Sequence, residues 1–236
     1  MRKIVAVAVL ALALFSTAFT VRAEEAKKEP AAATPAIKDP KRHEGFLAIA
    51  KKGDVDLLFL GDSITDGWRG GGKKVWDEAF APLKAANFGI SGDRTQHVLW
   101  RIQNGELEGI KPKLAVLMIG TNNGNDTKED VALGITTIIT EIHKRLPETK
   151  VLLLGIFPRG AKAEDKARAK NHQVNEIVAK LDDGGKTVKY LDIGDKFLDD
   201  KKDLPKDIMP DALHPNAKGY QIWADAILPT VKEMMK

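Results

Sequence analysis

The sequence places a serine, Ser63, directly after the apolar run 57–60 and a Gly-Asp turn. A serine hydroxyl is a weak nucleophile until a base accepts its proton, and a histidine held by a carboxylate can be that base. Glycine, aspartate and serine are also frequent in ordinary turns. This stretch alone therefore leaves two interpretations open, a nucleophile or a polar turn, and any partners must come from elsewhere in the chain.

Of the five histidines, His214 has the most suitable neighbour for a general base, because Asp211 precedes it by three residues in the segment DALHPN. The Asp211 carboxylate could accept the Nδ1–H of the imidazole and leave Nε2 free as a base. Pro215 disfavours a helical conformation of His214 and suits the first position of a helix. We therefore expect His214 directly before the last helix. The alternative is a capping loop in which Asp211 and His214 have no chemical role.

Two further loops carry groups that could stabilise a developing oxyanion. Gly92, in the segment ISGD, offers a backbone N–H that no side chain covers. Asn122, in GTNN, offers a side-chain NH₂, and the Ser63 N–H is a third donor if Ser63 begins a helix. Each of these residues is also common in turns, and only their combination points to chemistry.

An alternation of apolar strands and amphipathic helices would position these loops. Short apolar runs predict strands at residues 57–60, 85–89, 114–119, 151–154 and 188–193. Apolar residues at three- and four-residue spacing, with an alanine- and lysine-rich stretch, predict helices over 131–142, 161–181 and 220–231. This order predicts a parallel sheet with helices on both faces, in which ligands bind beyond the carboxyl ends of the strands.

Taken together, these loops resemble the four sequence blocks of the SGNH, or GDSL, hydrolase family. The matching residues are Gly61-Asp62-Ser63, Gly92, Gly120-x-Asn122 and Asp211-x-x-His214. The resemblance implies an α/β fold, a flavodoxin-like three-layer α/β/α sandwich with about five parallel strands. It also implies a catalytic triad and an oxyanion hole, with these roles by position: catalytic Ser63, Asp211 and His214; oxyanion hole Ser63, Gly92 and Asn122.

A narrower resemblance covers residues 87–113 and 155–160, which look like the catalytic subunits of the intracellular platelet-activating-factor acetylhydrolases. Three features depart from those subunits: an apparent export signal, the segment WRGGGKK, and the ending DALHPNAKGY, which looks more like bacterial esterases of the wider family. The resemblance therefore favours ester hydrolysis and leaves the choice between a lipid and a carbohydrate substrate open.

The first 23 residues are typical of a secretory signal peptide. Arg2 and Lys3 precede an apolar run from Ile4 to Leu14, and Ala23 ends a small-residue cleavage site. A membrane anchor is the alternative, but a spanning helix needs about 20 apolar residues. Residues 24–40 predict a flexible, proline-punctuated linker, so the catalytic domain is expected over 41–236. We expect an exported protein, periplasmic or extracellular, without stable membrane insertion.

Composition excludes several other classes of protein. The chain has 37 basic and 33 acidic residues, and the predicted signal peptide removes three basic ones, leaving 37 − 3 = 34 against 33. This balance gives no reason to expect nucleic acid as a partner. The chain has no cysteine, so a thiol nucleophile, a thiolate metal site and a disulfide are all excluded.

Two rival motifs fit the sequence less well. Residues 67–73 fit the start of a phosphate-binding loop, but Lys74 stands where that motif needs serine or threonine. We interpret Gly70–Lys74 as a flexible basic surface loop that borders the pocket. The α/β-hydrolase motif G-x-S-x-G lacks its second glycine around Ser63. No metal and no cofactor are expected.

The sequence thus predicts an exported serine esterase that hydrolyses short-chain esters, acetyl esters above all, by a Ser-His-Asp mechanism. The expected partner is a small ester or an acetylated carbohydrate. Two alternatives stay open: an acetylated-carbohydrate esterase rather than a lipid acetylhydrolase, and a non-catalytic glycan-binding protein on the same fold. The oligomeric state is not predicted.

Overall fold

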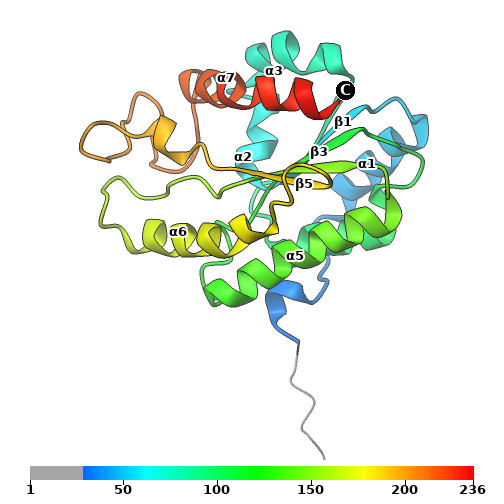
Figure 1. The fold of residues 1–236 in the computed structure, drawn as a ribbon, viewed down its shortest axis with the longest axis horizontal. Helices are drawn as coiled ribbons and strands as arrows, with labels where there is room; N and C mark the ends of the chain where they lie inside the picture. The colour runs from blue at the N-terminus through cyan, green and yellow to red at the C-terminus, as the bar shows by residue number, and fades with distance from the viewer. Residues whose placement is uncertain (1–28) are drawn as a thin grey trace, which may run out of the picture.

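The computed structural model describes residues 29–236, and the predicted signal peptide lies outside the described residues. Five parallel strands form one sheet in the order β2-β1-β3-β4-β5 (Figure 1). They are β1 (Leu57–Gly61), β2 (Ala85–Gly89), β3 (Leu114–Met118), β4 (Lys150–Leu154) and β5 (Val188–Leu191). The five predicted strands agree with these bounds to within two residues at each end. The chain order reverses at β1, which has β2 on one side and β3 on the other.

Helices cover both faces of the sheet, which confirms the predicted three-layer α/β/α sandwich (Figure 1). One face is covered by α1 (Pro40–Lys52), α4 (Thr95–Arg101), α5 (Lys128–Arg145) and α6 (Lys166–Val178). The other is covered by α3 (Lys73–Ala79) and α7 (Ala217–Met234), and the single turn α2 (Ser63–Asp66) follows β1. Short 3₁₀ turns lie at Ala31–Ala33, Gly67–Arg69, Ala81–Leu83, Ala179–Leu181 and Gly194–Phe197, and a π turn at Ile102–Glu106.

The strands are apolar along their whole length because both faces are covered. In β1, Leu58 and Leu60 pack on the α5 side, whereas Leu57 and Phe59 pack on the α7 side. All four side chains are buried. This is why β1 appears in the sequence as a continuous apolar run rather than an alternating one.

Capping residues set where the helices near the sheet edge begin. Asp39 accepts a hydrogen bond from the Arg42 N–H at the start of α1, and Thr127 accepts one from Asp130 at the start of α5. Asn216 accepts from two backbone N–H groups at the start of α7. The cap at Asn216 places His214 three residues before the first residue of α7, close to the last helix as the sequence predicts. Pro215 precedes the cap and does not occupy the first helical position.

Part of the segment predicted as a flexible linker over 24–40 lies against the domain. The Thr95 hydroxyl donates to the Ala32 carbonyl over 2.7 Å, and the Ala36 N–H donates to Gln96 over 3.1 Å. Ala32 is fully buried, and its carbonyl packs so closely on Gly134 that a Cβ there would lie 2.4 Å from it. Small side chains and backbone groups make this contact, so the sequence shows no apolar periodicity that would reveal it.

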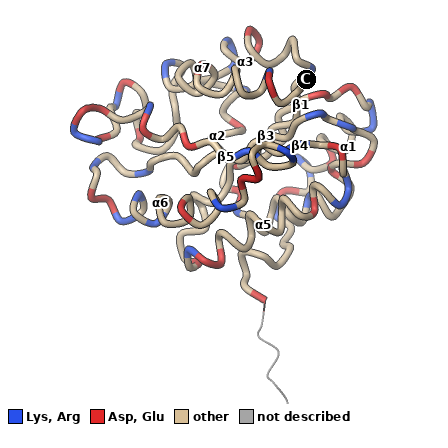
Figure 2. Tube along the Cα trace, viewed as in Figure 1, with Lys and Arg blue, Asp and Glu red and all other residues tan. Residues whose placement is uncertain are grey.

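Positive and negative residues are interspersed along the described chain (Figure 2). None of the helices within residues 29–236 is long and apolar enough to cross a membrane.

Candidate active site

Ser63 lies at the junction between the central strand and a helical turn. β1 ends at Gly61, and Ser63 is the first residue of α2, capped by Asp62, whose Oδ1 accepts from the Ile64 N–H over 3.0 Å. A Cβ on Gly61 would lie 2.5 Å from the Met118 carbonyl, so only glycine permits this close approach to β3. The strand therefore turns sharply and presents the Ser63 hydroxyl at the carboxyl edge of the sheet.

The structure brings Ser63, His214 and Asp211 into one chain of hydrogen bonds. Ser63 Oγ lies 2.8 Å from His214 Nε2, and His214 Nδ1 lies 2.6 Å from Asp211 Oδ2. An ionised carboxylate only accepts hydrogen bonds, so Nδ1 donates to Asp211. In the neutral imidazole Nε2 then carries the lone pair and accepts the Ser63 O–H. This is the arrangement expected from the spacing of Asp211 and His214.

Backbone donors fix the Asp211 carboxylate, although its side chain is about half exposed. Its Oδ1 accepts from the Leu213 N–H over 3.1 Å and from the His214 N–H over 2.7 Å. Burial opposes ionisation of Asp211, but the hydrogen bonds from His214 outweigh it and lower the pKa of the carboxyl. Ala212, which lies between Asp211 and His214 in the chain, has φ of 57°, an uncommon value for a residue with a side chain. The loop is therefore a defined turn that holds Asp211 in its charged form.

The other two predicted site residues lie on neighbouring loops. Gly92 has φ of 74°, which a residue with a side chain rarely adopts, and its N–H has no hydrogen-bond partner among residues 29–236. Asn122 Nδ2 donates to the Asp93 carbonyl over 2.9 Å. An amide NH₂ has two protons, so this bond orients the group and leaves the second proton free.

Asp93 connects these two loops to the domain beneath them. Its carboxylate is buried and accepts from Arg101 Nε over 3.2 Å and Nη2 over 3.0 Å. Arg101 also pairs with buried Glu106, where burial raises the pKa of the carboxyl although the Arg101 charge acts in the opposite direction. Lys38, from the N-terminal segment, donates to the Ser91 carbonyl and lies 3.4 Å from Asp93 Oδ1. The loop with Gly92 is thus held from both sides.

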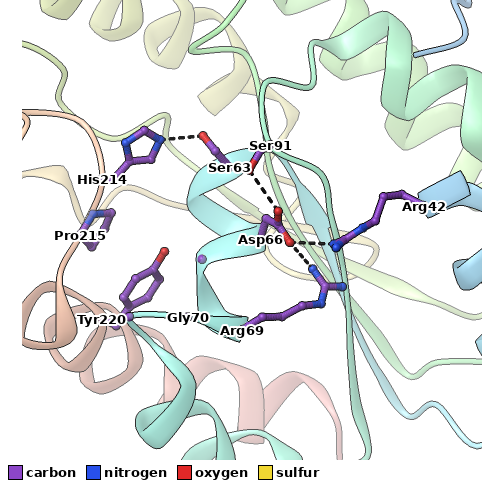
Figure 3. A pocket seen from close by; sticks show the side chains of 11 residues that line it. Arg42, Ser63, Asp66, Arg69, Gly70, Ser91, His214, Pro215 and Tyr220 are labelled. Carbon is purple, nitrogen blue, oxygen red and sulfur yellow. Dashed lines mark hydrogen bonds and ion pairs between the residues drawn. The ribbon is translucent and has the colours of Figure 1, made fainter. Parts of the chain in front are cut away.

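A cavity of about 600 Å³ opens beside Ser63. Figure 3 shows His214, Pro215 and Tyr220 on one side of it and Asp66, Arg69 and Arg42 on the other, with Ser63 between them. The remaining lining residues are Gly67, Gly70, Gly71 and Ser91. The charged side of this cavity was not predicted from the sequence. The sequence does carry a pattern that indicates it. Asp66 and Arg69 follow Ser63 at steps of three residues, and residues at this spacing lie on the same side of a helix.

The segment Gly70–Lys74 differs from the flexible basic loop that the sequence predicts. Gly70 and Gly71 line the cavity, whereas Lys73 and Lys74 begin α3. A Cβ on Gly72 would lie 2.6 Å from the Trp68 ring, so this turn is packed closely against aromatic side chains. Within residues 29–236 no three histidine, aspartate or glutamate side chains gather closely enough to hold a metal ion.

Comparisons with known proteins identify the family of the chain. The profile of the GDSL-like lipase/acylhydrolase family matches residues 59–222, so the chain belongs to this family and is a carboxylic ester hydrolase. It is 40% identical over 178 residues to the human platelet-activating factor acetylhydrolase IB subunit alpha1, covering 75% of this chain and 76% of that protein. It is 41% identical over 179 residues to the rat alpha2 subunit, covering 76% and 77%.

Solved structures share the fold at lower identity. A proposed acylhydrolase from Bacteroides fragilis superposes with a TM-score of 0.70 at 19% identity, covering 84% of this chain and 100% of that chain. A catalytic mutant of an acetylxylan esterase from Geobacillus stearothermophilus gives a TM-score of 0.59 at 20% identity, covering 74% and 93%. These likenesses confirm the SGNH hydrolase fold.

The pH dependence of stability tests whether the Asp62 carboxyl, next to Ser63, is buried as the structure shows. Burial raises its pKa to about 7, the Ile64 N–H opposes the rise, and the charge of Asp93 adds to it. Because the unfolded chain releases this proton near pH 4, the folded protein binds more protons between pH 4 and pH 7 and loses stability as the pH rises. The isosteric variant Asp62→Asn lacks this loss.

We therefore expect the free energy of unfolding of Asp62→Asn to rise relative to the unsubstituted protein between pH 4.5 and pH 7.5, by on the order of 3 kcal/mol. Urea unfolding of both proteins at the two pH values measures this difference. A difference that stays constant with pH would show that Asp62 is ionised throughout.

Proposed function

We propose that the chain is an exported serine esterase that hydrolyses short-chain esters, acetyl esters above all. The observation that carries this proposal is the chain of hydrogen bonds from Ser63 through His214 to Asp211 at the mouth of the cavity. In this proposal Ser63 is the nucleophile, His214 the general base and acid, and Asp211 the residue that orients the imidazole and stabilises its charged form.

The reaction proceeds in two steps. Ser63 Oγ attacks the ester carbonyl while its proton passes to His214 Nε2, and the tetrahedral intermediate carries its negative charge on the former carbonyl oxygen. The N–H groups of Ser63 and Gly92 and the free amide proton of Asn122 donate to that oxygen. When the ester bond breaks, His214 gives its proton to the leaving alcohol. A water then attacks the acyl-serine and gives a proton to His214. The bond between the acyl carbon and Ser63 Oγ breaks, His214 returns its proton to Oγ, and the acid leaves.

The lining of the cavity supports a short acyl group and a hydrophilic alcohol. Eight of its eleven lining residues are glycine, arginine, aspartate or serine, and Pro215 and Tyr220 are its two large apolar side chains. A long acyl chain needs a continuous apolar channel to compensate for its removal from water, at about 0.8 kcal/mol for each methylene. An acetylated sugar needs none, so the lining favours an acetylated-carbohydrate esterase over a lipid acetylhydrolase.

Export rests on the sequence of the first 23 residues. Two basic residues, Arg2 and Lys3, precede the apolar run Ile4–Leu14, and Val21-Arg22-Ala23 provides a cleavage site. Cleavage after Ala23 would leave the N-terminal segment that packs against Thr95 and Gly134 attached to the domain.

Substitution of the base tests the catalytic assignment. We expect His214→Gln to lower kcat for p-nitrophenyl acetate by at least about 10³-fold, because the Ser63 proton then has no acceptor. The matched control is His172→Gln, which removes an exposed histidine on α6 and should leave activity and stability unchanged.

A fluorophosphonate probe should label the unsubstituted protein and not Ser63→Ala. Full turnover by either site variant would refute the assignment, and absence of labelling would favour a non-catalytic glycan-binding protein.

The acyl specificity follows from the polar lining. We expect kcat/KM to fall along the series of p-nitrophenyl acetate, butyrate and octanoate, since no leucine, isoleucine, valine, methionine or phenylalanine lines the cavity to hold a longer chain. Initial rates for the three esters, each below its micellar concentration, measure the trend. A clear preference for octanoate would contradict the short-chain proposal.

Expression of the full chain in a bacterium tests export. We expect the protein in the periplasmic or culture fraction with Glu24 as its first residue, determined by N-terminal sequencing. The control Leu10→Arg interrupts the apolar run and should keep the chain in the cytoplasm at full length. A cytoplasmic protein that begins at Met1 would overturn the proposal.

A further inference from the structure

The charged side of the cavity contains two guanidinium groups and a single carboxylate. Asp66 Oδ1 accepts from Arg42 Nη2 over 2.7 Å and from Arg69 Nη1. Asp66 Oδ2 accepts from the Ser91 hydroxyl over 3.1 Å. Both arginines also donate to the Gly89 carbonyl, over 3.1 Å and 3.2 Å. Backbone carbonyls carry no formal charge, so Arg42, Arg69 and Asp66 leave one positive charge uncompensated.

These guanidinium groups are held in place yet accessible. The side chains of Arg42 and Arg69 are 37% and 36% exposed, and both line the cavity. Each also lies over the Phe46 ring, with the guanidinium carbon 5.5 Å and 5.7 Å from its centre. Burial and the neighbouring charge of Arg42 lower the pKa of Arg69, although the Asp66 carboxylate acts in the opposite direction. Two like charges this close repel each other. A bound anion would relieve this repulsion.

The pair lies close enough to Ser63 to contact the same substrate molecule. Ser63 and Asp66 are the first and last residues of α2, and residues three apart on a helix have Cβ atoms about 5–6 Å from each other. Figure 3 shows Arg42 and Arg69 converging on Asp66 from the side of the cavity opposite His214. A group bound between them would therefore belong to an ester whose carbonyl lies over Ser63.

We propose that Arg42 and Arg69 bind an anionic group, a carboxylate or a phosphate, on the ester that Ser63 attacks. The inference rests on the proposed function and specifies its substrate class as acidic esters. Planar guanidinium groups donate paired hydrogen bonds to carboxylate and phosphate oxygens. Within residues 29–236 both bonds of Arg42 to protein leave from Nη2, so its Nη1 protons are available to such a ligand.

Two matched pairs of acetyl esters test this inference. The carboxylate pair is an acetylated methyl glucuronide and the methyl glucoside acetylated at the same position. The phosphate pair is 1-acetylglycerol 3-phosphate and 1-acetylglycerol. We expect the anionic member of at least one pair to have a KM roughly tenfold below that of its neutral partner. A preference within the first pair indicates an acidic sugar, and one within the second indicates a phosphorylated glycerol headgroup.

The variants Arg42→Gln and Arg69→Gln should reduce the ratio of kcat/KM between the anionic and the neutral ester toward one. The control Lys74→Gln removes an equal charge from α3, outside the cavity, and should leave the ratio and the basal activity unchanged. If either glutamine variant fails to fold, the unsubstituted protein still decides. Its KM for the anionic ester should rise between roughly 20 mM and 500 mM NaCl while that for the neutral ester stays constant.

Two negative outcomes are distinguishable. Equal kcat/KM values within both pairs, or a preference that survives in Arg42→Gln and Arg69→Gln, would overturn the inference and leave the esterase proposal intact. Absence of any hydrolysis that depends on Ser63, for neutral as well as anionic esters, would overturn the proposed function itself.

Discussion

The hydrogen bond between Ser63 and His214 is 2.8 Å long and joins residues 151 positions apart in the chain. Bringing such distant groups together costs conformational entropy, which packing elsewhere must offset. The parallel sheet supplies that packing, since strands buried on both faces all end at one edge and their loops meet there. β1 lies next to the point where the strand order reverses, and this is where Ser63 emerges. The site therefore depends on the sheet topology more than on any one loop.

Asp93 has a comparable role for the loops that carry Gly92 and Asn122. Its carboxylate is buried against Arg101, and its carbonyl accepts the Asn122 amide. Removing one partner of a buried ion pair leaves an uncompensated charge, at a cost of about 3–5 kcal/mol. The position of the Gly92 N–H is thus coupled to the stability of the domain. Lys38 extends this coupling to the N-terminal segment, because it contacts both the Ser91 carbonyl and Asp93.

The sequence was sufficient to predict the layers, the five strands and the loops that approach Ser63, because burial on both faces produces uninterrupted apolar runs and because Asp211 and His214 are close in the chain. Two features could not be predicted. The contact of Ala32 with Gly134 uses a backbone carbonyl, which leaves no pattern of side chains. Arg42 lies on a different helix from Arg69, and only the fold shows that both reach Asp66. Charged residues on separate elements have no common sequence period.

The single turn α2 links the chemistry of the site to its charge. Ser63 begins the turn and Asp66 ends it, so the nucleophile and the residue that positions the arginines belong to one rigid unit. A Cβ on Gly89 would lie 2.4 Å from the Asp66 N–H, which shows how tightly β2 packs against this turn. Long side chains such as arginine lose considerable rotamer freedom when they are fixed. Asp66 and the Gly89 carbonyl hold Arg42 and Arg69 before any ligand arrives, so that loss is incurred on folding rather than on binding. The excess positive charge is consequently preorganised, at a fixed distance from the Ser63 hydroxyl.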